Sequence, residues 1–489
     1  MRQLALDRMS KVVETEFGNL NYESEVTARL SRSTFFVAED DIYQNRISRT
    51  EFEEWSHKQD VYIADKDMIL IEGYIGPDPA FRTGSRLYIE STQANIAAMQ
   101  RQLYFPRDSD WHPIFTVIYT PGLHAPGKPD DRLILVDLEH YVTRVFGSDY
   151  FGESKMGGLR MWNHYVYEQG GLALHSGLKT FPNVSGSEKS ALILGLSGTG
   201  KTTTTFRNQL ESMPVQDDFN ALMPDGSVYT TENGCFAKTY GLDPDDEPTI
   251  YGGTTRSDAW LENAYVDPSG RVDFFNSSYT ANGRSTFSLA NIRHRSPLNV
   301  PKADYLLLLN RNESIIPAVA RLTREQAPAY FMLGETKGTS AGGAAEAGKN
   351  LRVPGTNPFF FNNDAMQGNR IFEIMKAMPD LEVYVMNTGR VGGTDNDERS
   401  KKVRISHSSA VVEGIVAGTI EWEIDPEFGY EIARSIPGID DIELIQPYRL
   451  YERQGRLDEY ANIVERLKQE RREYLDAFIG LAPEITASI

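Results

Sequence analysis

The chain has 489 residues, of which 40% are apolar, 24% are charged and 11% are aromatic, and this composition is typical of a globular protein. It excludes the disordered, collagen-like and coiled-coil classes, while the length predicts two or three compact units. With 50 Lys and Arg against 69 Asp and Glu, the net charge is −19. This acidic balance argues against a surface that coats nucleic acid, although it leaves room for a local basic pocket.

Cys235 is the only cysteine, which excludes an intrachain disulfide and a thiolate metal cage. Eight histidines and many carboxylates leave metal sites with nitrogen and oxygen ligands open. The sequence contains neither the apolar core of a signal peptide nor an apolar run of 18 residues. We therefore expect a soluble cytoplasmic protein with a small-molecule substrate and no nucleic-acid or membrane partner, as a monomer or a small homo-oligomer.

The first part of the chain predicts a strand-rich domain. Residues 1–60 are polar and show no clear period, so they predict no particular element. Short β-branched or aromatic runs follow at 68–71, 115–119 and 133–136, separated by turn signals. A cluster of Gly, Pro and Ser within 170–189 predicts a boundary or a crossover. We therefore expect an N-terminal substrate-side domain over residues 1–170 and a C-terminal domain over 171–489.

The second part predicts an alternation of strands and helices, which favours an α/β fold. Apolar runs at 191–194, 305–309 and 381–386 indicate core strands, and a helix is expected from residue 201 to about 211. The last of these strands is preceded by a helix with one apolar face. Apolar residues also recur at helical spacing across 457–478, which predicts a packing helix rather than a partner-binding one. The expected apolar face before the third strand consists of Ile371, Ile374, Met375 and Met378.

Residues 195–202 match the phosphate-binding pattern G-x-x-x-x-G-K-[ST] in full. In this pattern the glycines let backbone N–H groups turn toward phosphate oxygens, the lysine reaches the β- and γ-phosphates, and the last hydroxyl ligates Mg²⁺. A chance glycine turn is the alternative, but the apolar strand before the loop and the helix after it favour nucleotide binding. The candidate nucleotide-binding residues are Gly195, Leu196, Ser197, Gly198, Thr199, Gly200, Lys201, Thr202 and Thr203.

Other polar residues are candidates for the same site. A phosphate-binding loop needs a carboxylate to complete its metal site, and Asp217 and Asp218 follow a short apolar run. His175 is interpreted either as a structural histidine or as a metal ligand, and Arg321 either as a surface residue or as a catalytic one. The Gly- and Ala-rich tract near 334–356 predicts a flexible loop or a lid that closes over the nucleotide.

Landmarks of one known family occur around the glycine loop in the family's order. They are Tyr150-Phe-Gly-Glu153, Asn163 to His175, Asp217-Asp218, Gly234-Cys-Phe-Ala-Lys238, Glu247-Pro248 with Ile250-Tyr251, Leu261-Glu-Asn263, Arg321-Leu-Thr323, Asn387-Thr-Gly389 and Arg404-Ile-Ser406. With them, residues 133–489 resemble the ATP-dependent phosphoenolpyruvate carboxykinase family, and fainter similarity extends back to about residue 80. The resemblance implies a two-lobed α/β fold with an atypical P-loop mononucleotide-binding C-terminal domain and a cleft between the lobes.

The resemblance also implies the chemistry. The family decarboxylates oxaloacetate and phosphorylates the resulting enolate from ATP, with Mg²⁺ on the nucleotide and a second divalent ion, usually Mn²⁺, at the substrate. Thr202 would bind the nucleotide Mg²⁺, and His175 and Asp218 would hold the second ion, which stabilises enolate charge. The residues expected around the transferred group are Lys201, Lys238, Arg321 and Asp217; those at the substrate are Arg82 and Tyr150; those along the adenine are Arg404 and Ile405.

Two departures from the family pattern fall on the substrate side. The family usually has a lysine ligand for the second metal where counting here puts Met156, and a thioether is a poor partner for a hard ion. Lys155 is adjacent, but on a strand it would need a local bulge to point the same way. The substrate motif Gly-Arg-Ser-Pro-Lys-Asp-Lys is reduced here to Phe81-Arg82-Thr-Gly-Ser-Arg86.

We therefore expect an ATP-dependent phosphoenolpyruvate carboxykinase and keep two alternatives open. One is a kinase of the same fold that phosphorylates a different small-molecule acceptor, because the departures cluster at the substrate. The other is a nucleotide-binding regulator without catalysis. The presence of Lys201, Thr202, Asp218 and Arg321 argues against the regulator, because a protein that only binds nucleotide has little need of a transition-state arginine.

Overall fold

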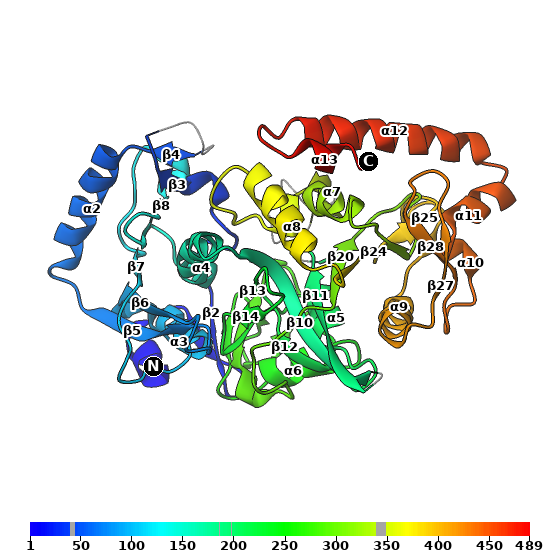
Figure 1. The fold of residues 1–489 in the computed structure, drawn as a ribbon. Coiled ribbons are helices and arrows are strands. Elements are labelled where there is room, and N and C mark those ends of the chain that lie inside the picture. The colour runs from blue at the N-terminus through cyan, green and yellow to red at the C-terminus, as the bar shows by residue number, and fades with distance from the viewer. Residues whose placement is uncertain (40–44, 185, 197, 339–348) are drawn as a thin grey trace.

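The computed structural model describes residues 1–489 apart from 40–44, 185, 197 and 339–348. Over the described residues, helices alternate with three large sheets in a mixed α/β fold, as the sequence predicts (Figure 1). The helices of this part of the chain are α1 (Arg2–Arg8), α2 (Arg49–Ile63), α3 (Ala94–Leu103), α4 (Phe151–Glu168), α5 (Lys201–Phe206), α6 (Pro248–Thr254), α7 (Gln326–Leu333), α8 (Ala365–Ala377), α9 (Ile405–Ala417), α10 (Ile442–Ile445), α11 (Pro447–Arg453), α12 (Leu457–Asp476) and α13 (Pro483–Thr486).

A seven-stranded mixed sheet forms from the first third of the chain. The three strands expected there from the apolar runs are confirmed as β5, β7 and β8, and α3 and α4 pack on this sheet. In sheet order the strands are β4 (Arg46–Ile47), β3 (Thr34–Val37), β8 (Leu133–Asp137), β9 (Val142–Phe146), β7 (Phe115–Thr120), β6 (Thr83–Glu90) and β5 (Met68–Ile75).

A ten-stranded sheet forms the centre of the molecule. Its middle strands β11, β20 and β24 run parallel, so the glycine loop after β11 lies at their carboxyl edge, where open α/β sheets place ligands. Figure 1 shows β10 and β11 as the long pair that crosses the centre. In sheet order the strands are β14 (Val228–Thr230), β13 (Phe219–Leu222), β10 (Leu172–Val184), β11 (Ser187–Leu194), β20 (Tyr305–Asn310), β24 (Glu382–Asn387), β21 (Val319–Arg321), β28 (Glu431–Ser435) and β27 (Glu421–Ile424), and β12 (Met213–Gln216) pairs with β10.

A third, five-stranded sheet joins the N-terminus to the middle of the chain. In sheet order its strands are β1 (Val12–Glu14), β2 (Leu20–Tyr22), β16 (Trp260–Glu262), β19 (Arg284–Ser288) and β15 (Gly234–Lys238). The described part of the first 60 residues thus contains α1, most of α2 and the strands β1 to β4, which the polar sequence did not predict. The remaining pairs are β17 (Tyr265–Val266) with β18 (Val272–Asp273), β22 (Glu335–Lys337) with β23 (Asn350–Arg352), and β25 (Arg390–Val391) with β26 (Lys401–Lys402).

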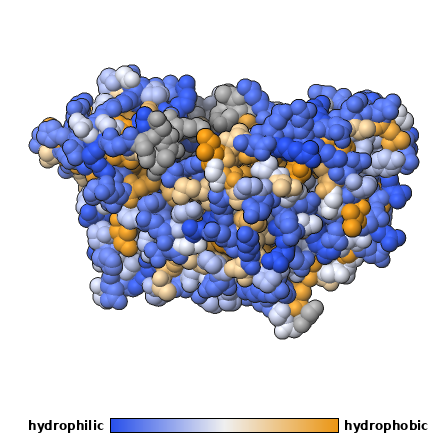
Figure 2. All heavy atoms as spheres, turned by 45° about the horizontal axis from the view of Figure 1, so that its top comes forward, coloured by the Kyte–Doolittle hydropathy of each residue, from blue (hydrophilic) through white to orange (hydrophobic). Residues whose placement is uncertain are grey.

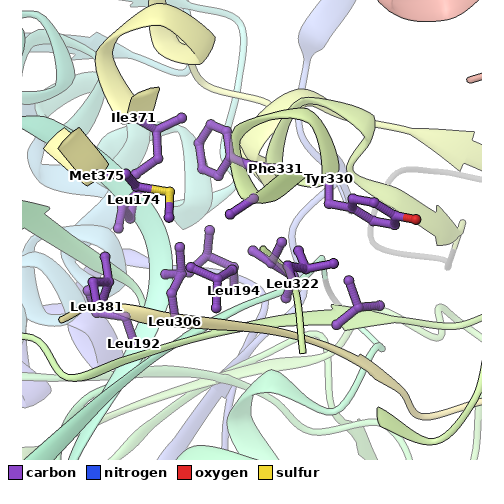
Figure 3. Close-up of a cluster of buried hydrophobic side chains, with 14 of the residues drawn as sticks. Leu174, Leu192, Leu194, Leu306, Leu322, Tyr330, Phe331, Ile371, Met375 and Leu381 are labelled. Carbon is purple, nitrogen blue, oxygen red and sulfur yellow. The ribbon is translucent and has the colours of Figure 1, made fainter. Parts of the chain in front are cut away.

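The largest apolar core lies between the ten-stranded sheet and the helices α7 and α8. Figure 3 shows Phe331 and Met375, from these two helices, facing Leu192, Leu194 and Leu306 on the strands. Such burial is the main favourable term in folding, and it fixes the position of β11 and therefore of the loop that follows it. The predicted apolar face of α8 is confirmed, because its members Ile371, Ile374, Met375 and Met378 all belong to this core.

Of two expectations about the segments next to the glycine loop, one stays a prediction and one is wrong. The segment 170–189, expected as a boundary or a crossover, contains the long strand β10, which pairs with β11 in an antiparallel ladder with a register shift between Phe181 and Val184, and the division into domains at 170 and 171 stays a prediction. The helix expected to reach about residue 211 ends at Phe206. Helix α5 is rich in Thr, which is a weak helix former, and Leu210 and Glu211 have positive φ angles of 50° and 57° that a helix does not allow.

The C-terminal helix is confirmed as α12, which lies along the top of Figure 1 next to α7. Its buried residues are Tyr460, Val464, Arg471 and Leu475, so one arginine joins the apolar face. Figure 2 shows a face on which hydrophilic residues dominate and apolar residues form small separate groups. Among the described residues, no helix combines the length and the hydrophobicity that crossing a bilayer requires.

Candidate active site

A cavity of about 370 Å³ lies beside the glycine loop and gathers side chains from distant parts of the chain. The structure therefore brings most of the predicted site residues together. Those that line the cavity are Tyr150, His175, Leu196, Gly198, Gly200, Lys201, Thr202, Thr203, Asp217, Asp218 and Lys238. Lining residues that sequence reasoning did not assign to the site include Arg29, Phe236, Glu247, Arg284, Lys337 and Phe359.

The glycine loop has the backbone that its sequence requires. Gly198 and Gly200 have φ angles of +86° and +92°, which residues other than glycine rarely adopt. A Cβ atom at Gly195 would come within 2.3 Å of the Thr199 hydroxyl oxygen, so this close packing also needs glycine. Gly195 and Thr199 therefore support the loop from behind and do not line the cavity, while Ser197 lies outside the described residues.

The hydroxyl of Thr202 and the carboxylate of Asp217 form a pair at the start of α5. Thr202 Oγ1 donates a hydrogen bond of 2.6 Å to Asp217 Oδ2. Burial raises the pKa of Asp217 to about 6, because the nearby Lys201 only partly compensates for the loss of water. Within the described residues, Oδ1 of Asp217 is buried and has no hydrogen-bond partner. The pair therefore offers one hydroxyl oxygen and one carboxylate oxygen to a ligand in the cavity.

His175 on β10 lies beside Asp218, which is in the short link between β12 and β13. His175 Nε2 is 3.2 Å from Asp218 Oδ1, and Lys201 Nζ is 3.4 Å from the same oxygen. His175 Nδ1 lies 2.9 Å from the Thr356 carbonyl oxygen, which can only accept, so Nδ1 carries a proton. Burial, reinforced by Lys201, lowers the pKa of His175. A neutral His175 would then turn the lone pair of Nε2 toward Asp218, an arrangement that suits a shared cation.

Lys155 reaches Asp218 without the bulge that the sequence reading required. The segment is the helix α4, not a strand, so consecutive side chains differ by about a quarter turn rather than by opposite faces. Lys155 Nζ makes a short ion pair with Asp218 Oδ2 and lies 3.1 Å from Glu232 Oε2. Burial alone would lower the pKa of Lys155, but these two carboxylates raise it. Met156 lines the cavity next to it, so the thioether faces the site.

Two cations stand directly opposite each other on one wall of the cavity. Lys238 on β15 pairs in register with Arg284 on β19, and both line the cavity. Burial, followed by the charge of Arg284, lowers the pKa of Lys238 to about 8. The amide of Asn282 ties this wall to its neighbours, because its oxygen accepts from Arg284 Nη2 at 2.9 Å and its nitrogen donates to Tyr150 Oη at 3.4 Å. Like charges in this position destabilise a sheet when no anion lies between them.

Arg29 is the arginine that sequence reasoning missed. It lies in the loop between β2 and β3 and lines the cavity, with its guanidinium 5.8 Å from the Phe359 ring centroid. The next residue is anchored to α4, because Leu30 N donates to Glu153 Oε1 at 2.6 Å. A signal was present in the sequence: residues 28–34 read Ala-Arg-Leu-Ser-Arg-Ser-Thr, and the spacing of Arg29 and Arg32 matches that of the first two basic residues in Gly-Arg-Ser-Pro-Lys-Asp-Lys, whereas Thr34 stands at the place of the last lysine.

The expected substrate role of Arg82 is not supported. Arg82 does not line the cavity, and its Nη1 forms an ion pair of 2.7 Å with Asp108. Its guanidinium also lies 4.1 Å from the centroid of the Tyr74 ring. The physical reason is that Arg82 directly precedes β6, the strand next to the edge strand β5, where local partners satisfy its charge. Arg86, on the same strand, donates to Thr116 Oγ1 at 3.0 Å and lies outside the cavity as well.

Three further predicted residues lie elsewhere. Arg321 does not line the cavity; its Nε is 2.5 Å from Glu431 Oε2, and it stacks over Trp422. Arg321 on β21 stands opposite Glu431 on the neighbouring strand β28, so the two side chains share one face of the sheet. Its expected contact with the transferred phosphoryl group is therefore not supported. Arg404 and Ile405, at the start of α9, are exposed and do not line the cavity, so their contact with adenine stays a prediction.

The expected lid near 334–356 is a hairpin at its described base. Strands β22 and β23 pair antiparallel, and Lys337, Gly338 and Leu351 line the cavity. Lys337 Nζ also makes an ion pair of 2.6 Å with Glu313. The remainder of the predicted lid, 339–348, lies outside the described residues.

The fold and the cavity define a mixed α/β protein whose site combines a phosphate-loop sequence with a dense group of lysine, arginine and carboxylate side chains. The family model described as phosphoenolpyruvate carboxykinase matches residues 1–442, and the chain belongs to this family. The match starts at residue 1, so the resemblance that we placed at 133–489 extends over the first residues as well. It ends before α12, so the last residues lie beyond it.

Individual relatives agree with this assignment. The chain is 31% identical over 432 residues to a protein of Aeropyrum pernix, covering 85% of this chain and 82% of the relative. It is 30% identical over 379 residues to a protein of Afipia carboxidovorans, covering 74% and 69%, and 27% identical over 441 residues to one of Moorella thermoacetica, covering 87% and 81%. All three relatives are named phosphoenolpyruvate carboxykinase (ATP).

Proposed function

We propose that this chain is an ATP-dependent phosphoenolpyruvate carboxykinase, which converts oxaloacetate and ATP to phosphoenolpyruvate, ADP and CO₂. The observation that carries the proposal is the opposed pair Lys238 and Arg284 in the same cavity as Lys201. Three cations around one space are stable when polyanions fill it, and a triphosphate with a dicarboxylate supplies such anions. We also propose the two-lobed arrangement with a P-loop C-terminal domain, in a cytoplasmic enzyme that is a monomer or a small homo-oligomer.

The proposed role of each residue follows from where its side chain lies. Loss of CO₂ leaves the electrons of the broken C–C bond on an enolate, whose oxygen then attacks the γ-phosphorus while ADP leaves. Lys201 and Lys238 would neutralise the phosphoryl oxygens during this transfer. Arg29, with its planar fork of donors, would hold a substrate carboxylate, and Tyr150 would donate to the carbonyl. Arg29 takes the role that the sequence reading gave to Arg82.

The residues at the start of α5 fit a Mg²⁺ ion bound with ATP. Thr202 offers a hydroxyl oxygen and Asp217 a buried carboxylate oxygen, Oδ1, that lacks a hydrogen-bond partner in the described part of the chain. Hard oxygen ligands of this kind are those that Mg²⁺ prefers. When bound, the ion would withdraw charge from the phosphates. Thr202 and Asp217 would hold it, and Lys201 would neutralise the transferred group.

The protein offers only two suitable side-chain ligands for a second ion. His175 Nε2 and Asp218 Oδ1 suit a divalent ion, which would stabilise enolate charge when bound. The third side chain at this point is the thioether of Met156, a poor ligand for Mn²⁺. Lys155 does not replace it, because its ammonium is engaged with Asp218 and Glu232 below the cavity wall. We therefore propose that the second ion has two protein ligands and binds weakly.

A substitution tests this second ion directly. Met156→Lys should raise the affinity for Mn²⁺ by about tenfold, because it adds a nitrogen ligand beside His175 and Asp218. Titration of Mn²⁺ followed by electron paramagnetic resonance measures the change, and Met156→Leu, which conserves volume, is the matched control and should leave the affinity unchanged. Equal Mn²⁺ binding in all three proteins would count against an ion at His175 and Asp218.

A kinase with a different small-molecule acceptor is the second candidate, and Met156 at the substrate end favours it. A direct assay separates the two. Purified protein with ATP, Mg²⁺ and Mn²⁺ should form phosphoenolpyruvate from oxaloacetate, detected by coupling to pyruvate kinase. Turnover of ATP with another acid but not with oxaloacetate would favour the second candidate. Tight ATP binding without any turnover would instead indicate the regulator.

A further inference from the structure

Helix α12 meets the hairpin β22–β23 through a buried ion pair. Arg471 on α12 is fully buried, with its Nε 3.0 Å from Glu335 Oε1 and its Nη2 2.7 Å from Glu335 Oε2. Its Nη1 donates to the hydroxyl of Tyr330 on α7 at 3.0 Å. A bidentate arginine of this kind fixes both the distance and the angle between the two elements. The first strand of the hairpin is therefore held at its first residue.

The second strand is bound to the same helix. Arg352 on β23 stands opposite Glu335 in the ladder, and its Nη2 lies 3.2 Å from Glu335 Oε1. Its Nη1 donates to the Glu470 carbonyl oxygen at 3.3 Å, and its guanidinium lies 5.3 Å from the Tyr474 ring centroid. Both strands therefore contact one turn of α12, which spans residues 470–474.

The same hairpin borders the cavity. Leu351 lines the cavity together with Lys337 and Gly338, which follow Glu335 along the chain. Side chains alternate along a strand, so Lys337 lies on the face that carries Glu335 and Arg352, and Leu351 lies on the opposite face. The hairpin base thus contacts α12 through Glu335 and Arg352 and the cavity through neighbouring residues of both strands, so a shift of α12 would move a cavity wall.

We propose that α12 sets the position of the hairpin base at the nucleotide side of the cavity, with Arg471 as a positioning residue for Lys337 and Leu351. This inference rests on the proposed ATP-dependent function. It gives a role to a helix that lies beyond the residues matched by the family model. Burying an arginine and a glutamate is costly unless both are fully partnered, so the pair is kept where geometry matters.

Arg471→Lys tests the proposal, because it keeps the positive charge and removes the guanidinium that binds Glu335 in a bidentate manner. Calorimetric titration with ATP and Mg²⁺ should show a dissociation constant raised by about fivefold or more, a typical size for coupling between linked sites. The KM for oxaloacetate and the kcat at saturating ATP should be unchanged, a split that a general loss of stability would not produce. Arg472→Met is the matched control, because Arg472 is exposed on the same turn, and it should leave ATP affinity unchanged.

A second variant covers the case in which Arg471→Lys does not fold. Tyr474→Leu removes the ring over Arg352 without leaving a buried charge, and it should raise the same dissociation constant. Unchanged ATP affinity in either folded variant would overturn the inference while leaving the proposed function intact. Absence of ATP binding by the unaltered chain would overturn both, and the same titration reveals which case applies.

Discussion

Arg29 and Arg82 allow a matched comparison at the scale of one side chain. Of the two, Arg29 lines the cavity and Arg82 is paired with Asp108 outside it. Arg29→Gln should raise the KM for oxaloacetate at least tenfold, because a carboxylate would lose a charged bidentate partner, which is worth about 1.5–3 kcal/mol. Arg82→Gln should change this KM less than twofold. Steady-state kinetics of both variants measure the two KM values. A larger rise in KM for Arg82→Gln than for Arg29→Gln would place Arg82, not Arg29, at the substrate.

The charge on Lys238 predicts how activity depends on pH. Burial and Arg284 lower its pKa to about 8, so Lys238 is protonated below pH 8 and neutral above it. Because only the ammonium can neutralise phosphoryl oxygens, kcat/KM for ATP should fall as the pH rises through about 8. Lys238→Arg keeps the charge and should shift the fall to higher pH. Lys58→Arg, at an exposed position, should leave the profile unchanged; an identical alkaline limb in Lys238→Arg would refute the assignment.

The neighbouring positions 155 and 156 mark the limit of prediction for single residues. The sequence identified Met156 at the place of a usual metal ligand, and this residue does line the cavity. The sequence could not place Lys155, because the direction of its side chain depends on whether the segment is a helix or a strand. In a helix the two side chains point in different directions, so Lys155 pairs with Asp218 while Met156 lines the cavity.

At the scale of elements, a buried lysine connects β10 to the short helix α5. Lys179 Nζ donates to the carbonyl oxygens of Thr204 at 2.9 Å and Arg207 at 2.7 Å and also bonds Gln209 Oε1. These carbonyls belong to the end of α5, where a helix leaves acceptors without internal partners. Lys179 therefore holds in place the helix whose first residue is Lys201.

Loss of the hydrogen bonds from Lys179 to the end of α5 should lower the stability of the protein. Lys179→Met should lower the free energy of unfolding by about 3 kcal/mol, because buried acceptors would be left without donors. Lys302→Met removes an exposed pair with Asp380 and should cost less than about 1 kcal/mol. Urea denaturation of both variants provides the comparison. Equal midpoints would indicate that solvent reaches the end of α5.

Elements were predicted well where a strong apolar period was present. The core strands β11, β20 and β24 and the helices α8 and α12 were all found, because their apolar residues follow the period of the structure. The strand β10 was not predicted, because glycine and proline signals outweighed its apolar residues. The burial of Arg471 on α12 was not predicted either, since only tertiary contact with Glu335 explains it.

At the scale of the whole molecule, the third sheet makes the N-terminus part of the site's support. Leu20 on β2 lies beside Trp260 on β16, and the same sheet carries Lys238 and Arg284. Leu20→Ala should lower the free energy of unfolding by about 3 kcal/mol, because it leaves a cavity in a buried position. Val13→Ala, on the exposed edge strand, should change it by less than about 0.5 kcal/mol. Unfolding followed by tryptophan fluorescence tests both, and equal stabilities would mean that these strands are dispensable.

The class of fold and most of the site were predictable from motifs, whereas the long-range pairing was not. Glycine spacing and adjacent carboxylates are local features, so they predicted the loop and the residues Asp217 and Asp218 directly. Arg29 and Arg284 reach the cavity only through the assembly of the third sheet and the loop that follows β2. The strands β1 and β2 have three residues each, so they are too short to show a periodicity that predicts this assembly.

The parallel pairing of β2 with β16 also determines when the third sheet can form during synthesis. Residues 20–22 leave the ribosome long before their partner strand at 260–262 exists, and β19, the strand between β16 and β15, emerges later still. Until then the nascent N-terminal segment carries apolar side chains and open backbone groups that other molecules can bind. Pairing across such a separation also closes a large loop, which slows folding. The newly made chain is therefore a natural client for chaperones until about residue 288 has emerged.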